Sequence, residues 1–449
     1  MKPPAIRAWQ TNAALILIGA GMLVLTRQLV IEYHHFAIGF SGVSAWSAIF
    51  YIAAVWLILT QPVNRFTFPI ILIVAAACRL IPLCAEPHLS SDIYRYVWDG
   101  IVQHAHISPY RYVPGDSHLA FLRAPHQQIF DHINRRDIAP TIYPPAAQIL
   151  FYLVTFVSPT VFFMKTTMVL FEGVTMYALI ALLRDLGLRR EQSLLYAWCP
   201  LLIWEIAGSG HLDSAAIAFV TLALLACYRR QPVATGIFLA IAVLLKLYPL
   251  VLFPALYRRK EWKMPAAFAG LIALGYAAYS SAGLLVFGYF GGYVKEEGIA
   301  SGTRYFLLDL AQHIPGLHNL PITAFFVFSA CVCAAIVLWA WNRNSSSVMN
   351  SAAFLAPAFV LAAALMFLYS SHYAWYILWL IPFFTLVPNL PILIYLMGFF
   401  YLYTTPLAVP GPGMFRLNEI LYAAVLAAAL VHVALRGRHT KVERIGDRS

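Results

Sequence analysis

Long apolar runs separated by short polar segments recur along the whole chain. About 20 apolar residues are needed for a helix to cross the ~30 Å hydrocarbon core of a bilayer. The pattern predicts crossings at residues 11–30, 43–60, 68–84, 161–183, 193–208, 264–287, 321–342, 351–370, 373–387, 391–409 and 417–435, with another between Asp213 and Arg229. It therefore predicts an all-α, polytopic transmembrane protein.

The same pattern predicts one membrane domain over residues 1–449 with three parts. Residues 1–65 form an extra N-terminal helical hairpin, residues 85–160 an external loop with interfacial helices, and residues 161–449 the remaining transmembrane helices. Lys2 and Arg7 precede the first run, which places the N-terminus in the cytoplasm because short cytoplasmic segments are rich in Lys and Arg. The loop that follows residue 84 is then external.

Two apolar segments conflict with the charge rule if each crosses the membrane once. Residues 146–157 are short and end at Ser158-Pro159. An interfacial or re-entrant helix there keeps the three arginines of residues 184–190 inside. Residues 233–257 lie between Arg229-Arg230 and the basic residues 258–260. Two half-helices that turn back at residues 246–249 keep both basic clusters inside, so we expect a turn that lines a cavity.

Composition agrees with a membrane protein. The chain is 61% hydrophobic and 11% charged, whereas globular domains are about 25% charged. The net charge of +11 resides largely in short loops and in the basic tail, where topology places Lys and Arg. It does not indicate a nucleic-acid partner.

The external loop opens with a charged and aromatic stretch, SSDIYRYVWDG (residues 90–100). In a helix, Asp92, Arg95, Tyr96 and Asp99 lie at i, i+3, i+4 and i+7, on one face. An acid beside a guanidinium suits proton abstraction next to a bound phosphate. The alternative is an amphipathic helix with its charges among lipid headgroups.

Further ionisable groups near apolar segments are functional candidates, because such groups are costly in a membrane. Arg79, His211, Asp213 and Lys246 fall near the predicted external side, as do Lys165 and His372. Each has a structural alternative. Arg79, Lys165 and Lys246 are long enough to reach headgroups, and Asp213 is a good helix N-cap. His372, with Tyr373, Trp375 and Tyr376, fits an interfacial aromatic belt.

Four segments in order carry a family resemblance: SSDIYRYVWDG, INRRDIAPTIYPPAAQILF, GSGHLDS and LLKLYPLVLFPALYRR. With them, residues 75–265 resemble the bacterial polyprenol-phosphate-mannose-dependent mannosyltransferases, within the GT-C class of membrane glycosyltransferases. The resemblance implies a GT-C fold and an inverting transfer from a polyprenyl-phosphate sugar, most often mannose, to a lipid-linked or glycan acceptor. It places the site on the outer face of a bacterial cytoplasmic membrane.

The resemblance also implies residue roles. Asp92 matches the general base, Arg95 and Tyr96 lie near the donor phosphate, His211 and Asp213 match a second-loop acidic motif, and Lys246 matches a lysine that meets phosphate. Apart from the resemblance, the positive charge of Arg79 makes it a candidate ligand for the phosphate. Asp99 has two open roles, to orient substrate hydroxyls or to pair with Arg95. Asp92 and Asp213 are also candidates for holding a divalent cation, and no other cofactor is indicated.

Two rival functions follow. The same machinery suits another sugar, such as arabinose or aminoarabinose. A lipid flippase or secondary transporter would instead show charges near the bilayer midplane and internal repeats, whereas the charges here gather towards one face. The sequence assigns no role to residues 1–65.

Overall fold

The computed structural model describes residues 6–32, 39–87, 89–289, 291–292, 294, 305–346, 352–369, 373–398 and 418–432. Within these ranges every regular element is a helix and no strand occurs, which confirms the all-helical prediction. Four helices are long and apolar enough to cross a membrane: Ala8–Ile31, Gly42–Thr60, Val161–Asp185 and Ile322–Asn342. Large apolar side chains such as Leu17 and Val327 are exposed on them, as lipid-facing positions require.

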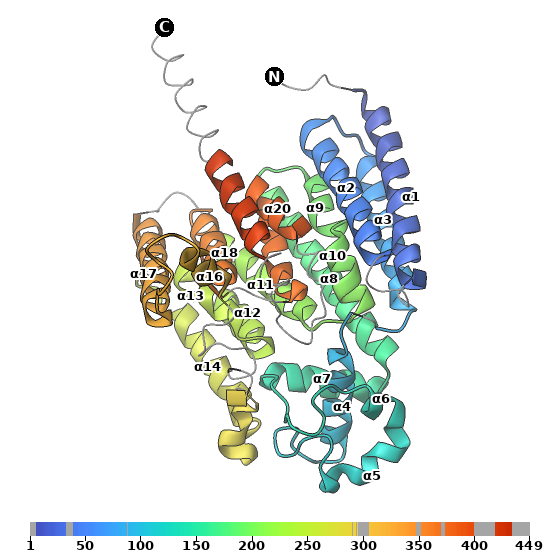
Figure 1. The fold of residues 1–449 in the computed structure, drawn as a ribbon, viewed down its shortest axis with the longest axis vertical. Helices are drawn as coiled ribbons and strands as arrows, with labels where there is room; N and C mark the ends of the chain where they lie inside the picture. The colour runs from blue at the N-terminus through green and yellow to red at the C-terminus, as the bar shows by residue number, and fades with distance from the viewer. Residues whose placement is uncertain are drawn as a thin grey trace.

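The chain begins with three packed helices and a polar insertion. Helix α1 (Ala8–Glu32) packs against α2 (Gly39–Thr60) and α3 (Thr67–Leu83). The insertion that follows contains α4 (Asp92–His104), η2 (Ser117–Leu119), α5 (Ala120–Arg123), η3 (Ala124–His126), α6 (Gln127–Asp131) and α7 (Pro145–Val157). Figure 1 shows α4 to α7 together at one end of the bundle.

The remaining helices complete the bundle. They are α8 (Val161–Asp185), η4 (Arg190–Ser193), α9 (Leu194–Ala197), α10 (Pro200–Leu202), η5 (Ile203–Gly208), α11 (Asp213–Tyr228), α12 (Pro232–Leu245), η6 (Tyr248–Leu252), α13 (Phe253–Leu256), α14 (Lys263–Ala277), η7 (Ser280–Phe287), α16 (Phe306–Gln312), α17 (Ile322–Ser346), α18 (Leu355–Tyr369), η8 (Ala374–Leu380), α19 (Ile381–Leu386), α20 (Leu390–Gly398) and a last helix at Asn418–His432. Helix α11 packs on both α8 and α12. This helix is buried on nearly all sides, as expected for a helix that is apolar all round.

The predicted turn at residues 246–249 is present. Helix α12 ends at Leu245, and Lys246 adopts an extended backbone with φ −147° and ψ 139°. Pro249 prevents α12 from continuing. The chain then returns to its starting end, because Arg258 donates a hydrogen bond to the carbonyl of Cys227 at 3.1 Å. The basic clusters on either side of this hairpin therefore lie at the same end of the bundle.

Two predicted crossings are not straight helices. Residues 193–208 form α9, α10 and a π-helix, η5, because Pro200 interrupts the run. Residues 264–287 form α14 and η7, which meet at an angle of 107°. The predicted helix at 146–157 is α7, whose 13 residues reach only about 20 Å and which packs on α4. Other predicted features fall outside the described ranges: His372, the second half of the crossing at 391–409, and the basic tail beyond residue 432.

Candidate functional site

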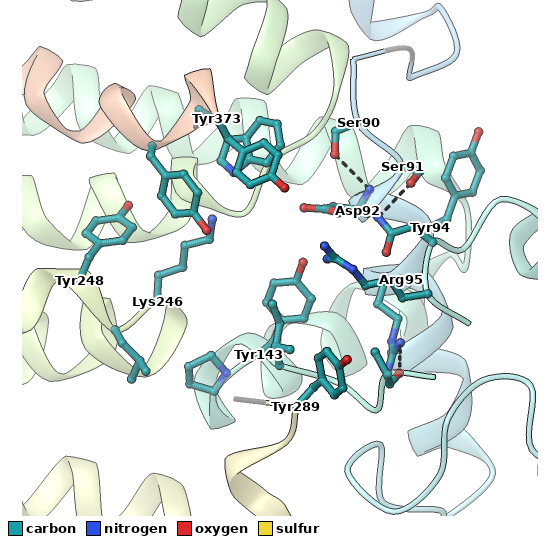
Figure 2. A pocket seen from close by; sticks show the side chains of 18 of the residues that line it. Ser90, Ser91, Asp92, Tyr94, Arg95, Tyr143, Lys246, Tyr248, Tyr289 and Tyr373 are labelled. Atoms are coloured by element: carbon teal, nitrogen blue, oxygen red, sulfur yellow. Dashed lines mark hydrogen bonds between the residues drawn. The ribbon is translucent and has the colours of Figure 1, made fainter. Parts of the chain in front are cut away.

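A cavity of about 820 Å³ opens where the polar insertion meets the rest of the bundle. We call it the main cavity. Its walls come from the start of α4, the segment before α7, the turn after α12 and the start of η8. Figure 2 shows Asp92 and Lys246 pointing towards one another across this space, with Tyr143 and Tyr373 on its walls. Segments separated by more than 280 residues thus form one site.

Asp92 begins α4 and presents its carboxylate to the main cavity. Asn134 donates to its Oδ1 at 3.0 Å and also to the Ser91 hydroxyl at 3.1 Å. The Asp92 amide donates to the Ser90 hydroxyl at 3.2 Å. These bonds fix the position of the carboxylate while leaving the side chain half-exposed. Asp92 is the only acidic residue among the described residues that line this cavity.

Arg95 lines the cavity one turn after Asp92, and Asp99 holds it there. Arg95 Nε donates to Asp99 Oδ1 at 2.7 Å, and Nη1 donates to the Ala139 carbonyl at 2.9 Å. Gln148 donates to the other Asp99 oxygen at 2.9 Å. The Asp99 side chain is buried and is not in the cavity wall. Of the two roles left open for Asp99, the structure contains the pairing with Arg95.

Tyr96 lies behind the cavity wall rather than in it. Its ring stacks on Phe151 at 4.7 Å and meets the Tyr143 ring edge-on at 5.0 Å. Tyr143 itself lines the cavity. Tyr96 therefore supports the cavity residue Tyr143 and does not itself line the cavity.

Lys246 projects into the main cavity from the turn that follows α12, which ends at Leu245. Its ammonium donates to Asp213 Oδ2 at 2.6 Å and lies 5.2 Å from the centre of the Tyr376 ring. The Tyr248 hydroxyl donates to Asp213 Oδ1 at 3.4 Å. Asp213, the first residue of α11, thus fixes the lysine.

The Lys246 contact also bears on the proposed cation site. Asp213 has its carboxylate oxygens bonded to Lys246 and Tyr248 and does not line the cavity. A divalent cation bridging Asp92 and Asp213 would have to displace the lysine. Elsewhere in the described part of the chain, Asp309, His313 and Glu419 are close enough together to share an ion.

His211 is fully buried beneath the cavity wall. Its ring stacks on Trp375 at 4.3 Å, and its Nε2 lies 3.2 Å from Glu205 Oε2. Trp375 lines the cavity and stacks in turn on Tyr373 at 4.6 Å. His211 therefore supports the cavity wall through its contact with Trp375. The Gly210 backbone has φ +74°, and a Cβ there would collide with Ile93, so this turn requires glycine.

Arg79 is not at the main cavity. It pairs with Glu172 through two hydrogen bonds of 3.0 and 2.7 Å, and Nη1 donates to the Ala75 and Ala197 carbonyls. All of these groups are buried between α3, α8 and α9. The guanidinium connects three helices and is not available to a phosphate in the cavity.

Several residues of the cavity and of the buried charge pairs were missed by sequence reasoning. Glu172 and Glu205 lie in apolar runs, a signal that marks functional or paired groups. Asn134 and Arg135 of the INRRD segment line the cavity, together with the preceding His132. Arg135 has a positive φ of 51°, a conformation that costs energy for a non-glycine residue and is common at functional sites. Tyr373, Trp375 and Tyr376 line the cavity, contrary to their expected place in a lipid-facing belt.

Comparison with known proteins identifies the family. Neither the curated proteins nor the solved structures contain a match to the chain. The MptA_B family, described as alpha-(1->6)-mannopyranosyltransferase, N-terminal domain, matches residues 11–258. This match covers more than half of the chain and includes Asp92, Asp213 and Lys246. The protein therefore belongs to this mannosyltransferase family, which confirms the predicted enzyme class.

Proposed function

We propose that this mannosyltransferase moves mannose from a polyprenyl-phosphate donor to a lipid-linked or glycan acceptor, with inversion at the anomeric carbon. We place the reaction on the outer face of a bacterial cytoplasmic membrane. The observation that carries the proposal is the position of Asp92 opposite Lys246 across one cavity at the end of a membrane bundle. A base and a phosphate ligand are the two groups that this transfer needs.

The reaction balances with these groups. Asp92 accepts the proton of the acceptor hydroxyl as its oxygen attacks the anomeric carbon. The bond between that carbon and the phosphate oxygen breaks, and the polyprenyl phosphate leaves with the electron pair. Lys246 and Arg95 stabilise the phosphate charge. Because phosphate is already a good leaving group, no nucleotide-binding loop is required.

The presence of one cavity acid supports inversion. Retention by double displacement requires a second side chain to form a covalent sugar intermediate, as glycosidases show with paired carboxylates about 5 Å apart. Among the described cavity residues Asp92 is the only acid, and Asp213 is bonded to Lys246. A single displacement uses one carboxylate and inverts the anomeric centre.

The first experiment compares donors. Purified enzyme in lipid would receive radiolabelled polyprenyl-phosphate mannose or, separately, a nucleotide-linked mannose, with an α-(1→6)-linked mannooligosaccharide as acceptor. We expect transfer from the lipid donor alone and a product with the opposite anomeric configuration to the donor. Transfer from the nucleotide sugar alone, or retention of configuration, would overturn the proposal.

A further inference from the structure

A second cavity of about 420 Å³ lies beside the main cavity. We call it the side pocket. It is bounded by the end of α3, the start of α8 and the segment containing η3 and α6. Pro87 and Tyr94 belong to the walls of both cavities. The two spaces are therefore neighbours separated by the Tyr94 ring and a proline.

The polar groups of the side pocket are mixed donors and acceptors. They are Glu86, His126, Gln127, Gln128, Thr160 and Lys165. Lys165 is buried and donates to the Pro82 carbonyl at 2.7 Å and to the Ala85 carbonyl at 2.6 Å. An ammonium has three protons, so one proton remains for a ligand oxygen.

This lining differs from the main cavity in charge. Among the described residues of the lining, Lys165 is the only lysine or arginine, and its ammonium already donates to two carbonyls. Burial lowers the pKa of His126, which keeps this imidazole neutral at pH 7. Glu86 supplies one carboxylate. A phosphate would find no cluster of free cations here, whereas a neutral ligand with many hydroxyls would find amides, a carboxylate and an imidazole.

Tyr94 connects the pocket to the reaction. It lies two residues after Asp92 on the first turn of α4, and its ring stacks on His132 of the main cavity at 4.7 Å. Burial and the Glu86 carboxylate both raise the pKa of Tyr94, so its hydroxyl stays protonated as a donor. A ligand in the side pocket thus lies one aromatic ring away from the cavity that contains Asp92.

We infer that the side pocket binds a sugar unit of a glycan acceptor, which extends past Tyr94 so that its reacting hydroxyl reaches Asp92. The inference rests on the proposed function. Tyr94 offers a ring face to the apolar side of the sugar, and Glu86, Gln128 and Lys165 bond its hydroxyls. A glycan longer than one sugar therefore gains affinity from this pocket, and the enzyme prefers such acceptors over free mannose.

The test uses Gln128→Trp, which fills the side pocket from an exposed position. The matched control is Phe121→Trp on α5, an exposed position outside both cavities. With an α-(1→6)-linked mannotriose as the probe, we expect Gln128→Trp to raise KM for the acceptor about tenfold or more while KM for the donor stays within about twofold. Glu86→Gln should shift the acceptor KM in the same direction.

A binding measurement separates this inference from the proposed function. Calorimetric titration of mannotriose into wild type and Gln128→Trp needs no donor. If wild type binds mannotriose and Gln128→Trp does not, the result supports the assignment of the pocket, even if polyprenyl-phosphate mannose proves not to be the donor. Unchanged binding and unchanged acceptor KM in both pocket variants, or no mannotriose binding to wild type, would overturn the assignment of the pocket while leaving the donor assignment intact.

Discussion

At the scale of single residues, Asp92 is the side chain on which the proposed chemistry depends. Its carboxylate accepts a hydrogen bond from the neutral amide of Asn134, while the hydroxyls of Ser90 and Ser91 accept from the Asp92 amide and from Asn134. Oδ1 of Asp92 is thus bonded to an uncharged donor, and the carboxylate faces the main cavity. The nearest arginine on α4 is already bonded to Asp99, so Arg95 does not neutralise the base.

We predict that Asp92→Asn lowers turnover by roughly 10²- to 10⁴-fold, the usual contribution of a general base, with little change in donor affinity. The asparagine carbonyl can still accept from Asn134, so the local fold is retained. Steady-state transfer assays test this, with Asp131→Asn as the control. Asp131 lies in the same insertion, exposed and outside the cavity. Near-normal turnover in Asp92→Asn would remove Asp92 from the base role.

Lys246 and Asp213 form a salt bridge, so their roles are tested with a single and a double variant. We predict that Lys246→Met alone abolishes donor binding and destabilises the fold by about 3–5 kcal/mol, the cost of leaving a buried charge unpaired. The double variant Lys246→Met/Asp213→Asn should recover stability but not donor binding. Thermal unfolding and a polyprenyl-phosphate binding assay provide the two readouts. Donor binding by the double variant would return Lys246 to a structural role.

Sequence reasoning located Asp92, Arg95, Lys246 and Asp213, because charged groups beside apolar runs are visible without a structure. It named Asp99 as one candidate partner of Arg95, which the structure contains, but not the partners of the other charged groups. Arg79 was expected at a phosphate, and it pairs with Glu172, 93 residues away. Which acid a buried arginine meets depends on how α3 and α8 pack, and the local sequence of neither helix specifies that contact.

At the scale of elements, the charge rule predicted the hairpin at residues 233–257 correctly, because two basic clusters required the same side. No comparable signal marked the 107° bend between α14 and η7. The run 264–287 is mostly apolar, and the chain bends at Ala278-Tyr279, between the end of α14 and the start of η7. Apolar length predicts that a segment is buried in protein or lipid, not that it is straight.

The approach of α4 to α7 gives an element-scale prediction. A Cβ on Gly100 would lie 2.7 Å from the Phe151 carbonyl and would collide with Thr155. We predict that Gly100→Ala separates the two helices, lowers stability by about 1–3 kcal/mol and reduces activity, because Arg95 and Tyr143 shift with them. Gly173→Ala on α8, where nothing lies within 4 Å of the added Cβ, is the control. Equal effects of the two changes would contradict this account.

The Arg79–Glu172 pair gives a second element-scale prediction. Arg79→Met leaves Glu172 buried without its partner and should destabilise the bundle by about 3–5 kcal/mol. Arg79→Met/Glu172→Met should restore much of this loss and retain transfer activity, since neither residue reaches the main cavity. Thermal unfolding in detergent and transfer assays check both. If the stable double variant is inactive with weakened donor binding, Arg79 belongs to the phosphate site after all.

At the scale of the whole molecule, both cavities are lined by residues of the polar insertion, whose helices α4 to α7 lie at one end of the bundle (Figure 1). Lys246 follows the end of α12, whereas the basic clusters flank the other end of the hairpin, where Arg258 meets Cys227. The positive-inside rule places basic clusters in the cytoplasm. The reaction would then take place outside, where a lipid-linked sugar is the natural donor because its chain remains in the membrane.

Residue accessibility in intact cells tests this orientation. Cys84 is exposed at the end of α3 beside the side pocket, and a variant that keeps it as the single cysteine provides a reporter for the cavity end. Arg259→Cys in a background without Cys84 reports the opposite end, since Arg259 is exposed next to the basic cluster. We expect a membrane-impermeant maleimide to label Cys84 in intact cells and Arg259→Cys only after permeabilisation. The reverse pattern would place both cavities in the cytoplasm. In that case the donor would meet the enzyme on the leaflet where nucleotide sugars are available, and the argument for a polyprenyl-phosphate donor would lose its topological support.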